Sequence, residues 1–557
     1  MKITWSGFKG ENRALQPLLV ADSQSTLSLN QNPVRGDMRP WGAPLTVATV
    51  PPGRNTIYRM GRDVASDTLY WLSWPGVVYA VRGFNPDDTT ERTYYTGDGV
   101  PKWTDNTIAL ASAPYPTTFR TLGVPAPVSQ LILTASGGVS TIIETRYYVY
   151  TFVSDKGEES SNSPVSLVLK CKIDDAVAIS NIATPPAGSY TVNRIRIYRT
   201  QTTASSGAPF LFRREVAAGL TSTTDDNRDI NAEPLPSAGW LPPPADLSNL
   251  TGMWNGMMAG ISGNAVRVCE AFKPYAWPIA YDILPPDSKP VALKVFGQAL
   301  LVLTTGRPRL VTGGTPDALD DQPVEWVEAC VSARSAVSFG HGVAWACPDG
   351  LAYFGSGGPK MITQGLMTRE DWQAIKPETI VGSMYEGAYL GEYTVAGVTK
   401  GFVVDPMNPS GMFFTDIPAS AFFFDEYQDQ LYLLDGVNIK KWNYGAALTA
   451  TARSKLFRTP KPVNFGCFQV TADAYPVNVK VDCLNMDPLE VTRLAVINPR
   501  LTVLTTKSLR FEVNVPNSLA QRLPAGFTAD QWQIQVSSTG AVQGVAMAQS
   551  IKELAEI

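Results

Sequence analysis

The sequence is short of the residue types on which most enzyme chemistry depends. Its 557 residues contain one histidine, His341, which stands between two glycines. A Ser-His-Asp triad or a His-based metal site needs histidine beside its partners, so a lone histidine at a predicted strand edge is expected to be structural. The Gly-rich residues 355–358 precede a predicted strand and no Lys-Ser/Thr follows them, so a phosphate-binding loop is not expected.

Cysteine is also scarce, and no two cysteines have C-x-x-C spacing. The six are Cys171, Cys269, Cys330, Cys347, Cys467 and Cys483. We expect small buried hydrophobic residues in a reducing compartment, because free cysteine is among the most buried residue types. The spacing argues against a disulfide framework or a zinc site.

Long apolar runs and positive charge are missing as well. No run approaches the ~20 apolar residues of a membrane helix, and Met1 to Trp5 lead into polar sequence, unlike a secretory signal. We therefore expect a protein made in the cytosol without membrane insertion. The formal net charge is −4, whereas a protein that grips DNA through its phosphates should be basic.

What the chain has in quantity is turn residues between short β-rich runs. It contains 45 glycines and 43 prolines, with 10% aromatic and 17% charged residues. This composition is typical of an ordered all-β protein. Helix is expected only at residues 369–376 and 549–556.

Residues 337–363 predict a tight meander of three strands, at 342–346, 351–354 and 360–363. The turn at Pro348-Asp349-Gly350 separates the first two, because proline presets φ and glycine accepts positive φ. Similar meanders are predicted at 253–268, 295–313, 384–405 and 422–442, with strands at 295–303 and 384–393. Spacing of roughly forty residues is typical of propeller blades, so we predict a β-propeller of five or six blades.

Two further β domains are predicted beside the propeller. Between Pro-rich stretches lies an inserted fibronectin-III-like β-sandwich, with a strand at 146–153, a hairpin at 154–160, and a strand at 194–199 paired with 210–216. Strict alternation at 194–199 predicts one buried face and one basic face. Strands at 467–472, 477–482, 508–515 and 531–536 predict a C-terminal β-sandwich. The predicted segments are an irregular N-terminal arm (1–45), the first part of the propeller (46–125), the inserted sandwich (126–245), the rest of the propeller (246–450) and the C-terminal sandwich (451–557).

Neighbouring acidic residues occur four times, at Asp174-Asp175, Asp225-Asp226, Asp320-Asp321 and Glu158-Glu159. Glycosidases need two carboxyl groups that face each other across a sugar, whereas sequence neighbours within a strand point to opposite faces. We expect these pairs to lie in solvated loops. Trp5, Trp41, Trp71, Trp74 and Trp103 are expected in core or interface positions. No catalytic residue, cofactor-binding residue or metal ligand is predicted.

Several motifs, in this order, resemble the tail nozzle (tail tubular) proteins of short-tailed bacteriophages. The motifs are PKWTDN at 101–106 with LGVPAP at 122–127, YVYTFVS at 148–154 with GEES at 157–160, CVSARS at 330–335 leading to PDGL at 348–351, and LPAG at 523–526 leading to Trp532. The similarity extends from about residue 40 to the end of the chain.

This resemblance implies a non-enzymatic structural virion protein without cofactors. It implies a homohexameric ring around the DNA channel of a short viral tail, docked to the portal or adaptor protein and contacting tail fibres or other tail proteins. The ring retains the genome and then conducts double-stranded DNA during ejection, without sequence-specific binding. The implied location is the virion tail, after synthesis in the host bacterial cytoplasm.

A ring of identical subunits needs two different patches on each subunit. We hypothesise that the N-terminal arm and the strand at 194–199 supply them, so that deletion of residues 1–40 abolishes the ring. Two alternative functions remain open at this stage. One is a carbohydrate-binding or carbohydrate-cleaving β-propeller that contacts the host envelope, and the other is an adaptor, hub or head-closure protein of the tail.

Overall fold

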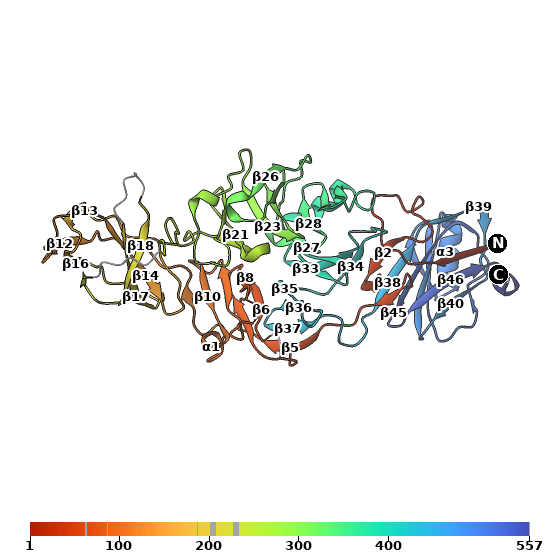
Figure 1. Cartoon of the computed structure of the whole chain (residues 1–557). Helices are drawn as coiled ribbons and strands as arrows, with labels where there is room; N and C mark the ends of the chain where they lie inside the picture. Colours follow the sequence, from red (N-terminus) through yellow and green to blue (C-terminus); the bar gives the residue numbers. More distant parts are fainter. Residues whose placement is uncertain (62–63, 86, 187, 201–207, 227–232, 556–557) are drawn as a thin grey trace. The chain divides into compact units, whose positions relative to one another are not determined.

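The computed structural model describes residues 1–61, 64–85, 87–186, 188–200, 208–226 and 233–555 (Figure 1). The described chain is all-β, as the turn-rich composition predicts, and it divides into two compact units. One unit comprises residues 1–69 and 328–557, and the other comprises residues 70–327. No helix among the described residues is long and apolar enough to cross a membrane.

Outside the inserted sandwich, the described part of the unit of residues 70–327 contains three small antiparallel sheets. The first sheet has β8 (Tyr79–Arg82), β9 (Thr93–Thr96), β10 (Lys102–Thr104) and β11 (Arg120–Thr121). The second has β20 (Ser248–Gly252), β21 (Met258–Ser262) and β22 (Ala265–Val268). The third has β23 (Pro290–Phe296), β24 (Ala299–Thr304), β25 (Arg309–Thr312) and β26 (Asp320–Pro323). The short strand β7 (Trp71–Trp74) precedes them.

The other unit contains three more antiparallel meanders of this kind, the second of which is continuous with a larger sheet. They comprise β27 (Val337–Ser338), β28 (Gly342–Cys347), β29 (Gly350–Gly355) and β30 (Gly358–Met361), then β31 (Val381–Tyr385), β32 (Ala388–Val395), β33 (Val398–Val404) and β34 (Phe413–Thr415), then β35 (Ala421–Asp425), β36 (Gln430–Asp435) and β37 (Asn438–Lys441). The last sheet is completed by β5 (Leu45–Thr49), which pairs with β37. Strand β6 (Thr56–Arg59) also falls in this unit, so the segment predicted as the first part of the propeller (46–125) is shared between the two units.

The meander predicted at 337–363 is confirmed, with β27 as an additional first strand. Two other strand predictions are wrong, because each runs through a tight turn. Gly297, with a φ of 54°, separates β23 from β24 within the predicted strand 295–303. Glu386 and Gly387, with φ of 49° and 76°, separate β31 from β32 within 384–393. Two successive residues with positive φ are typical of a two-residue hairpin turn.

The inserted β-sandwich lies within residues 70–327, between β11 and β20. Its strands are β12 (Ile132–Ser136), β13 (Ile143–Arg146), β14 (Tyr148–Ser154), β15 (Leu169–Lys172), β16 (Ala176–Ser180), β17 (Val192–Thr200), β18 (Phe210–Ala217) and β19 (Ser222–Asp225). They form the sheets β12-β16-β19, β14-β17-β18 and β13-β15. The predicted pairing of 194–199 with 210–216 is confirmed by the antiparallel register of β17 and β18.

The C-terminal sandwich packs two sheets over one apolar core. One sheet has the order β1-β46-β40-β44, and the other contains β38, β45, β41, β43 and β42, with β39 on β45. The bounds are β38 (Ala450–Ser454), β39 (Phe457–Val463), β40 (Cys467–Ala472), β41 (Val477–Leu484), β42 (Leu501–Thr505), β43 (Ser508–Val515), β44 (Gln521–Arg522), β45 (Ala529–Ser538) and β46 (Val542–Ala548). The four strands predicted here are all present.

The predicted irregular arm instead contains strands, and it contributes one strand and several core side chains to the C-terminal sandwich. It contains β1 (Lys2–Ser6), β2 (Ser25–Leu29), β3 (Gln31–Asn32) and β4 (Arg39–Pro40). Strand β1 pairs with β46 along its whole length, so both ends of the chain lie in this body (Figure 1). Strand β2 links the sheet of β31–β34 to β38. The side chains of Trp5, Phe8 and Met38 are fully buried in the core of the sandwich.

Helices are few and short in the described chain. They are α1 (Asn106–Ala109), α2 (Arg369–Ala374), α3 (Pro488–Ile497) and α4 (Ile551–Ala555), with single 3₁₀ turns at Trp254–Gly256, Ile279–Tyr281, Pro316–Ala318, Ala333–Ser335 and Pro377–Thr379. Helices α2 and α4 match the two predicted ones. Helix α3, which begins after its N-cap Asp487 and packs on β42, was not predicted.

Candidate functional site

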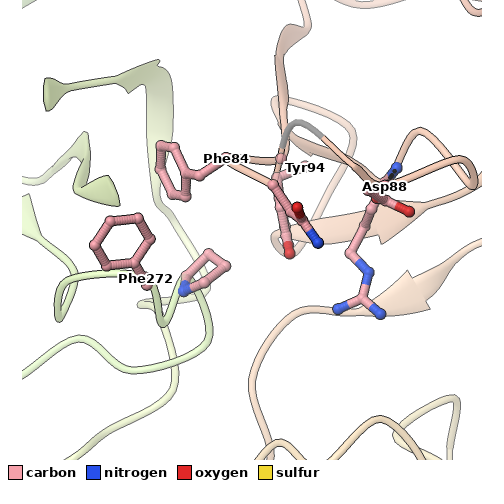
Figure 2. A pocket seen from close by; sticks show the side chains of 8 residues that line it. Phe84, Asp88, Tyr94 and Phe272 are labelled. Atoms are coloured by element: carbon pink, nitrogen blue, oxygen red, sulfur yellow. Dashed lines mark hydrogen bonds between the residues drawn. The ribbon is translucent and has the colours of Figure 1, made fainter. Parts of the chain in front are cut away.

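A pocket of about 480 Å³ opens in the unit of residues 70–327. It is lined by Gly83, Phe84, Asn85, Asp88, Arg92, Tyr94, Phe272 and Pro274. Figure 2 shows Phe84 and Phe272 together on one side of the pocket and Asp88 on the other, and the two phenyl rings meet edge to face at 6.4 Å. The volume lies in the range of small-molecule sites.

The Phe272 side chain is held out into the pocket by a strained backbone. Phe272 has a φ of 59°, and the residue is 68% exposed although phenylalanine is usually buried. Its N–H donates to the carbonyl oxygen of Gly256 at 2.8 Å. A Cβ on Gly256 would come within 2.4 Å of the Phe272 ring, so only glycine fits there. A non-glycine residue in the left-handed region beside a pocket is a feature of functional sites.

The polar side of the pocket is organised by Asp88. Its carboxylate accepts hydrogen bonds from the backbone N–H groups of Thr90 and Arg92, both at 2.9 Å. Burial alone would raise the pKa of Asp88, but the hydrogen bonds from Thr90 and Arg92 lower it. Arg92 stacks its guanidinium over the Trp103 ring at 4.5 Å and bonds to Glu158. The Asp88 carboxylate is therefore charged at neutral pH and already holds its own loop.

The arrangement suits a ligand with one apolar face and a polar rim. Aromatic rings stack against the C–H face of a sugar ring, while carboxylate, amide and guanidinium groups bond to hydroxyls. Burial raises the pKa of Tyr94 to about 12, so its hydroxyl stays protonated at neutral pH.

The sequence analysis did not predict this pocket, because it considered exposed tryptophan as the sign of a sugar-binding surface. The five tryptophans expected in core or interface positions are all buried.

The acidic pair Glu158-Glu159 is not in a solvated loop, contrary to the expectation from sequence. Both side chains are buried, and they have different partners. Glu158 pairs with Arg92 at 3.3 Å, which ties the inserted sandwich to the sheet of β8–β11. Glu159 pairs with Arg196 at 2.9 Å and accepts a hydrogen bond from Tyr198 at 2.6 Å. Burial raises the pKa of Glu158, although Arg92 opposes the rise.

The other acidic pairs also hold structure together. Asp225 is buried between Arg199 and Arg213. The carboxylates of Asp174 and Asp175 accept backbone N–H groups of the facing turn at residues 138–140. Asp321 pairs with Arg309 at 2.8 Å, and Asp320 accepts from Gln322 at 2.7 Å. None of these pairs presents two facing carboxylates to an open cleft among the described residues.

The basic face predicted for residues 194–199 is neutralised within the chain. Arg194 and Arg196 both pair with Glu215, at 3.4 Å and 3.0 Å. The alternation of burial ends at Tyr198, which is buried although it lies on the face of Arg194 and Arg196, and Arg199 is buried on the opposite face against Asp225. Arg194 and Arg196 thus have acidic partners within the chain, and the docking of this strand onto a neighbouring subunit stays a prediction.

The remaining candidate residues have structural surroundings. His341 is exposed in the turn before β28, with the rings of Phe339 and Tyr353 about it at 6.2 Å and 6.3 Å. All six cysteines are buried, as expected from the residue type, and none forms a disulfide bond within the described chain. Within the described ranges, no group of three or more His, Cys, Asp or Glu is placed to hold a metal ion.

One carboxyl group is buried without compensation. Glu392 in β32 is 3% exposed, and its Oε2 atom has no hydrogen-bond partner among the described residues. Burial raises the pKa of Glu392 well above its ordinary value. The folded state therefore holds the proton of Glu392 more tightly than the unfolded state does. As pH rises above the unfolded pKa of about 4.3, this difference lowers the free energy of unfolding.

We expect Glu392→Gln to make the protein about 1–3 kcal/mol more stable at pH 8, because the neutral amide carries no ionisation penalty. The gain should shrink towards pH 4.5, where the carboxyl group is protonated in both states. Thermal unfolding at a series of pH values measures this. Glu386→Gln, at an exposed turn of the same sheet, is the control and should change little. A gain that does not depend on pH would contradict the explanation.

Comparisons with known proteins give no family for this chain. No family model matches the sequence, and no curated protein matches it. Among solved structures, AztD of Citrobacter koseri is similar over 71% of this chain and 99% of its own, at 11% identity and a TM-score of 0.23. An exo-β-1,3-galactanase of Phanerochaete chrysosporium, solved with galactose, is similar over 75% of this chain and 100% of its own, at 8% identity and a TM-score of 0.17. TM-scores this low transfer neither fold nor function to this chain.

Proposed function

We propose that this chain is a structural tail protein of a short-tailed bacteriophage, a nozzle subunit that forms a hexameric ring around the DNA channel. In this proposal the six small sheets are the blades of a β-propeller. The inserted and C-terminal sandwiches supply contacts to neighbouring subunits and to the portal or adaptor protein. The protein shapes a passage that retains the genome and then conducts it, and it has no catalytic role.

The observation that supports this proposal most is the repetition of small antiparallel sheets along the chain. Six antiparallel meanders recur along the chain, with the inserted sandwich after the first and the fifth continuous with a sheet of the C-terminal sandwich. The last, β35-β36-β37, takes its outer strand β5 from the N-terminal part of the sequence, which gives it the four strands typical of a propeller blade. The ordered motifs that resemble nozzle proteins lie in these sheets and in both sandwiches.

Charge is compatible with a conduit. DNA that must slide through a tube should bind weakly, so the wall should be neutral or mildly negative. The net charge of −4 meets this condition, and many arginines are paired within the chain, as Arg196 and Arg309 are.

Negative-stain imaging and mass measurement of the purified protein test the proposal. We expect a ring with a central hole and about six times the mass of one chain. A protein that remains a single chain at every concentration tested would contradict it. Imaging of virions then separates a nozzle from an adaptor, hub or head-closure protein, because these occupy different levels of the tail.

A second candidate function is carbohydrate recognition at the host envelope, and the pocket of Phe84 and Phe272 favours it. We expect Phe272→Ala to weaken binding of a stacked sugar about tenfold, the loss of roughly 1.4 kcal/mol expected for one aromatic contact. A glycan array followed by titration of the bound sugar measures this. Tyr427→Ala removes an exposed aromatic ring elsewhere and is the control. An array without any bound glycan would contradict this candidate.

A further inference from the structure

Exposed apolar side chains gather on the inserted sandwich. Nine valine, leucine and isoleucine side chains between residues 128 and 173 are 40–88% exposed. They are Val128, Ile132, Val139, Ile142, Ile143, Val165, Leu167, Val168 and Ile173. Single exposed apolar residues are ordinary, but a concentration on one small domain marks an interaction surface.

The nine residues form two clusters. In the first, the side-chain amide of Gln130 donates to the carbonyl oxygen of Val165, which brings the segment of Val128 and Ile132 beside that of Val165, Leu167 and Val168. We call these five residues the edge cluster. In the second, the N–H of Ile173 donates to the carbonyl oxygen of Ile142 at 3.0 Å. We call Val139, Ile142, Ile143 and Ile173 the tip cluster.

The strand pair β13-β15 separates the two clusters. At one end of the pair, Ile143 lies opposite Lys172, beside the tip cluster. At the other end, Arg146 lies opposite Leu169, beside the edge cluster. Four residues of strand span about 10–13 Å, so the clusters are distinct surfaces of one domain. A cyclic ring of identical subunits requires two such different patches on each subunit.

Charge on this surface is confined to the strand pair between the clusters, where Lys170 is exposed and Glu144 and Lys172 are half-buried, and the neighbouring sheet face carries none. The outward positions of β12 are Ile132, Thr134 and Ser136, and Ala178 of β16 is exposed beside Thr134. A surface that meets an identical chain of net negative charge must avoid like-charge contacts, which a neutral face does. A second copy of this chain therefore fits this surface better than a strongly charged partner.

The apolar area is that of a small specific contact. With about 100 Å² for a fully exposed aliphatic side chain, the edge cluster presents on the order of 300 Å² of apolar surface and the tip cluster on the order of 250 Å². A contact between the edge cluster of one copy and the tip cluster of the next would therefore bury on the order of 550 Å² of apolar surface in total. With its polar part this corresponds to an interface of about 1,000 Å², the lower limit for a specific contact.

We infer that the inserted sandwiches of neighbouring copies dock on each other, the edge cluster of one copy against the tip cluster of the next. This inference rests on the ring of the proposed function and specifies where its subunits meet. It replaces the basic strand 194–199 and the N-terminal arm as the docking surfaces.

Two charge-introducing variants test the inference in the full chain. Leu167→Glu breaks the edge cluster, and Ile143→Glu breaks the tip cluster. Both positions are at least 60% exposed, so each variant should fold with an unchanged melting temperature. Each variant alone should fall from the ring to the 60.3 kDa of a single chain in analytical ultracentrifugation. Val398→Glu, at an exposed hairpin of β33, is the control and should keep the ring.

Mixing the two variants separates edge-to-tip docking from other arrangements. The mixture retains one intact edge cluster and one intact tip cluster, so it should form a pair of twice the single-chain mass and go no further. Rings in both variants, or no pair in the mixture, would overturn the inference while leaving the nozzle proposal standing. A wild-type protein that stays a single chain would overturn both.

Discussion

Replacement of Trp5 by alanine is expected to lower the free energy of unfolding of the C-terminal sandwich by about 3–5 kcal/mol, as is typical when a large buried aromatic side chain is removed. Trp5 is fully buried, and its ring lies 4.6 Å from that of Phe8. It lies in β1, opposite Val545 of β46. The first strand of the chain is therefore a core strand of the last domain.

Hydrogen exchange localises the effect of Trp5→Ala. Peptides that cover residues 467–472 and 542–548 should lose protection, because β40 and β46 pack in the same sheet as β1. Thr4→Ala, at an exposed position of the same strand, is the control and should cost less than about 1 kcal/mol. Unchanged protection of β40 and β46 in the tryptophan variant would contradict the assignment of β1 to this core.

This result bears on the deletion of residues 1–40. The irregular arm expected from sequence could be removed without damage to the fold, but β1 and β2 are structural strands. Loss of a ring after this deletion would follow from unfolding of the C-terminal sandwich and would say nothing about docking. Single exposed substitutions such as Leu167→Glu and Ile143→Glu are therefore the better test.

Sequence reasoning located most strands, because alternation and turn residues are local signals. The strands at 342–346 and 477–482 are where the pattern places them. It failed where a two-residue turn interrupts a continuous apolar run, as at Gly297 and Glu386. It also failed at residues 1–45, because β1 finds its partner at the other end of the chain and no local period reveals such a contact.

The candidate sites were less predictable than the fold. Phe84 and Phe272 come from distant segments, and only the folded chain brings their rings together. The role of the acidic pairs depends on arginines of other strands, as for Glu159 and Arg196. Alternation correctly predicted that one face of the strand at 194–199 is buried, but it could not show that its arginines already have acidic partners.

Replacement of Asp225 by asparagine is expected to cost the inserted sandwich about 3–5 kcal/mol at pH 7, the loss typical when one partner of a buried ion pair is removed. Asp225 accepts hydrogen bonds from Arg199 at 3.0 Å and from the Tyr148 hydroxyl at 2.7 Å, and it pairs with Arg213. All three partners are buried. Without the carboxylate, the buried guanidinium groups of Arg199 and Arg213 lose the charged partner that they share.

The neighbouring residue provides a matched control for Asp225→Asn. Asp226 is exposed, so Asp226→Asn should leave the stability of the sandwich unchanged within about 0.5 kcal/mol. Hydrogen exchange of peptides that cover residues 148–154 and 192–200 localises the effect, since β14 and β17 carry Tyr148 and Arg199. Equal effects of the two substitutions would contradict a buried ion cluster.

The pH dependence of the same cluster supplies an independent check. Burial alone would raise the pKa of Asp225, but hydrogen bonds from Tyr148 and Arg213 and the charges of Arg199 and Arg213 lower it. A carboxyl group with a lowered folded pKa stabilises the protein above its unfolded pKa of about 3.9 and loses this contribution as pH falls through the folded value. The difference in unfolding free energy between wild type and Asp225→Asn should therefore be constant from pH 7 to pH 5 and shrink below pH 4. A difference that persists undiminished in acid would show that the asparagine acts by altered packing rather than by loss of charge.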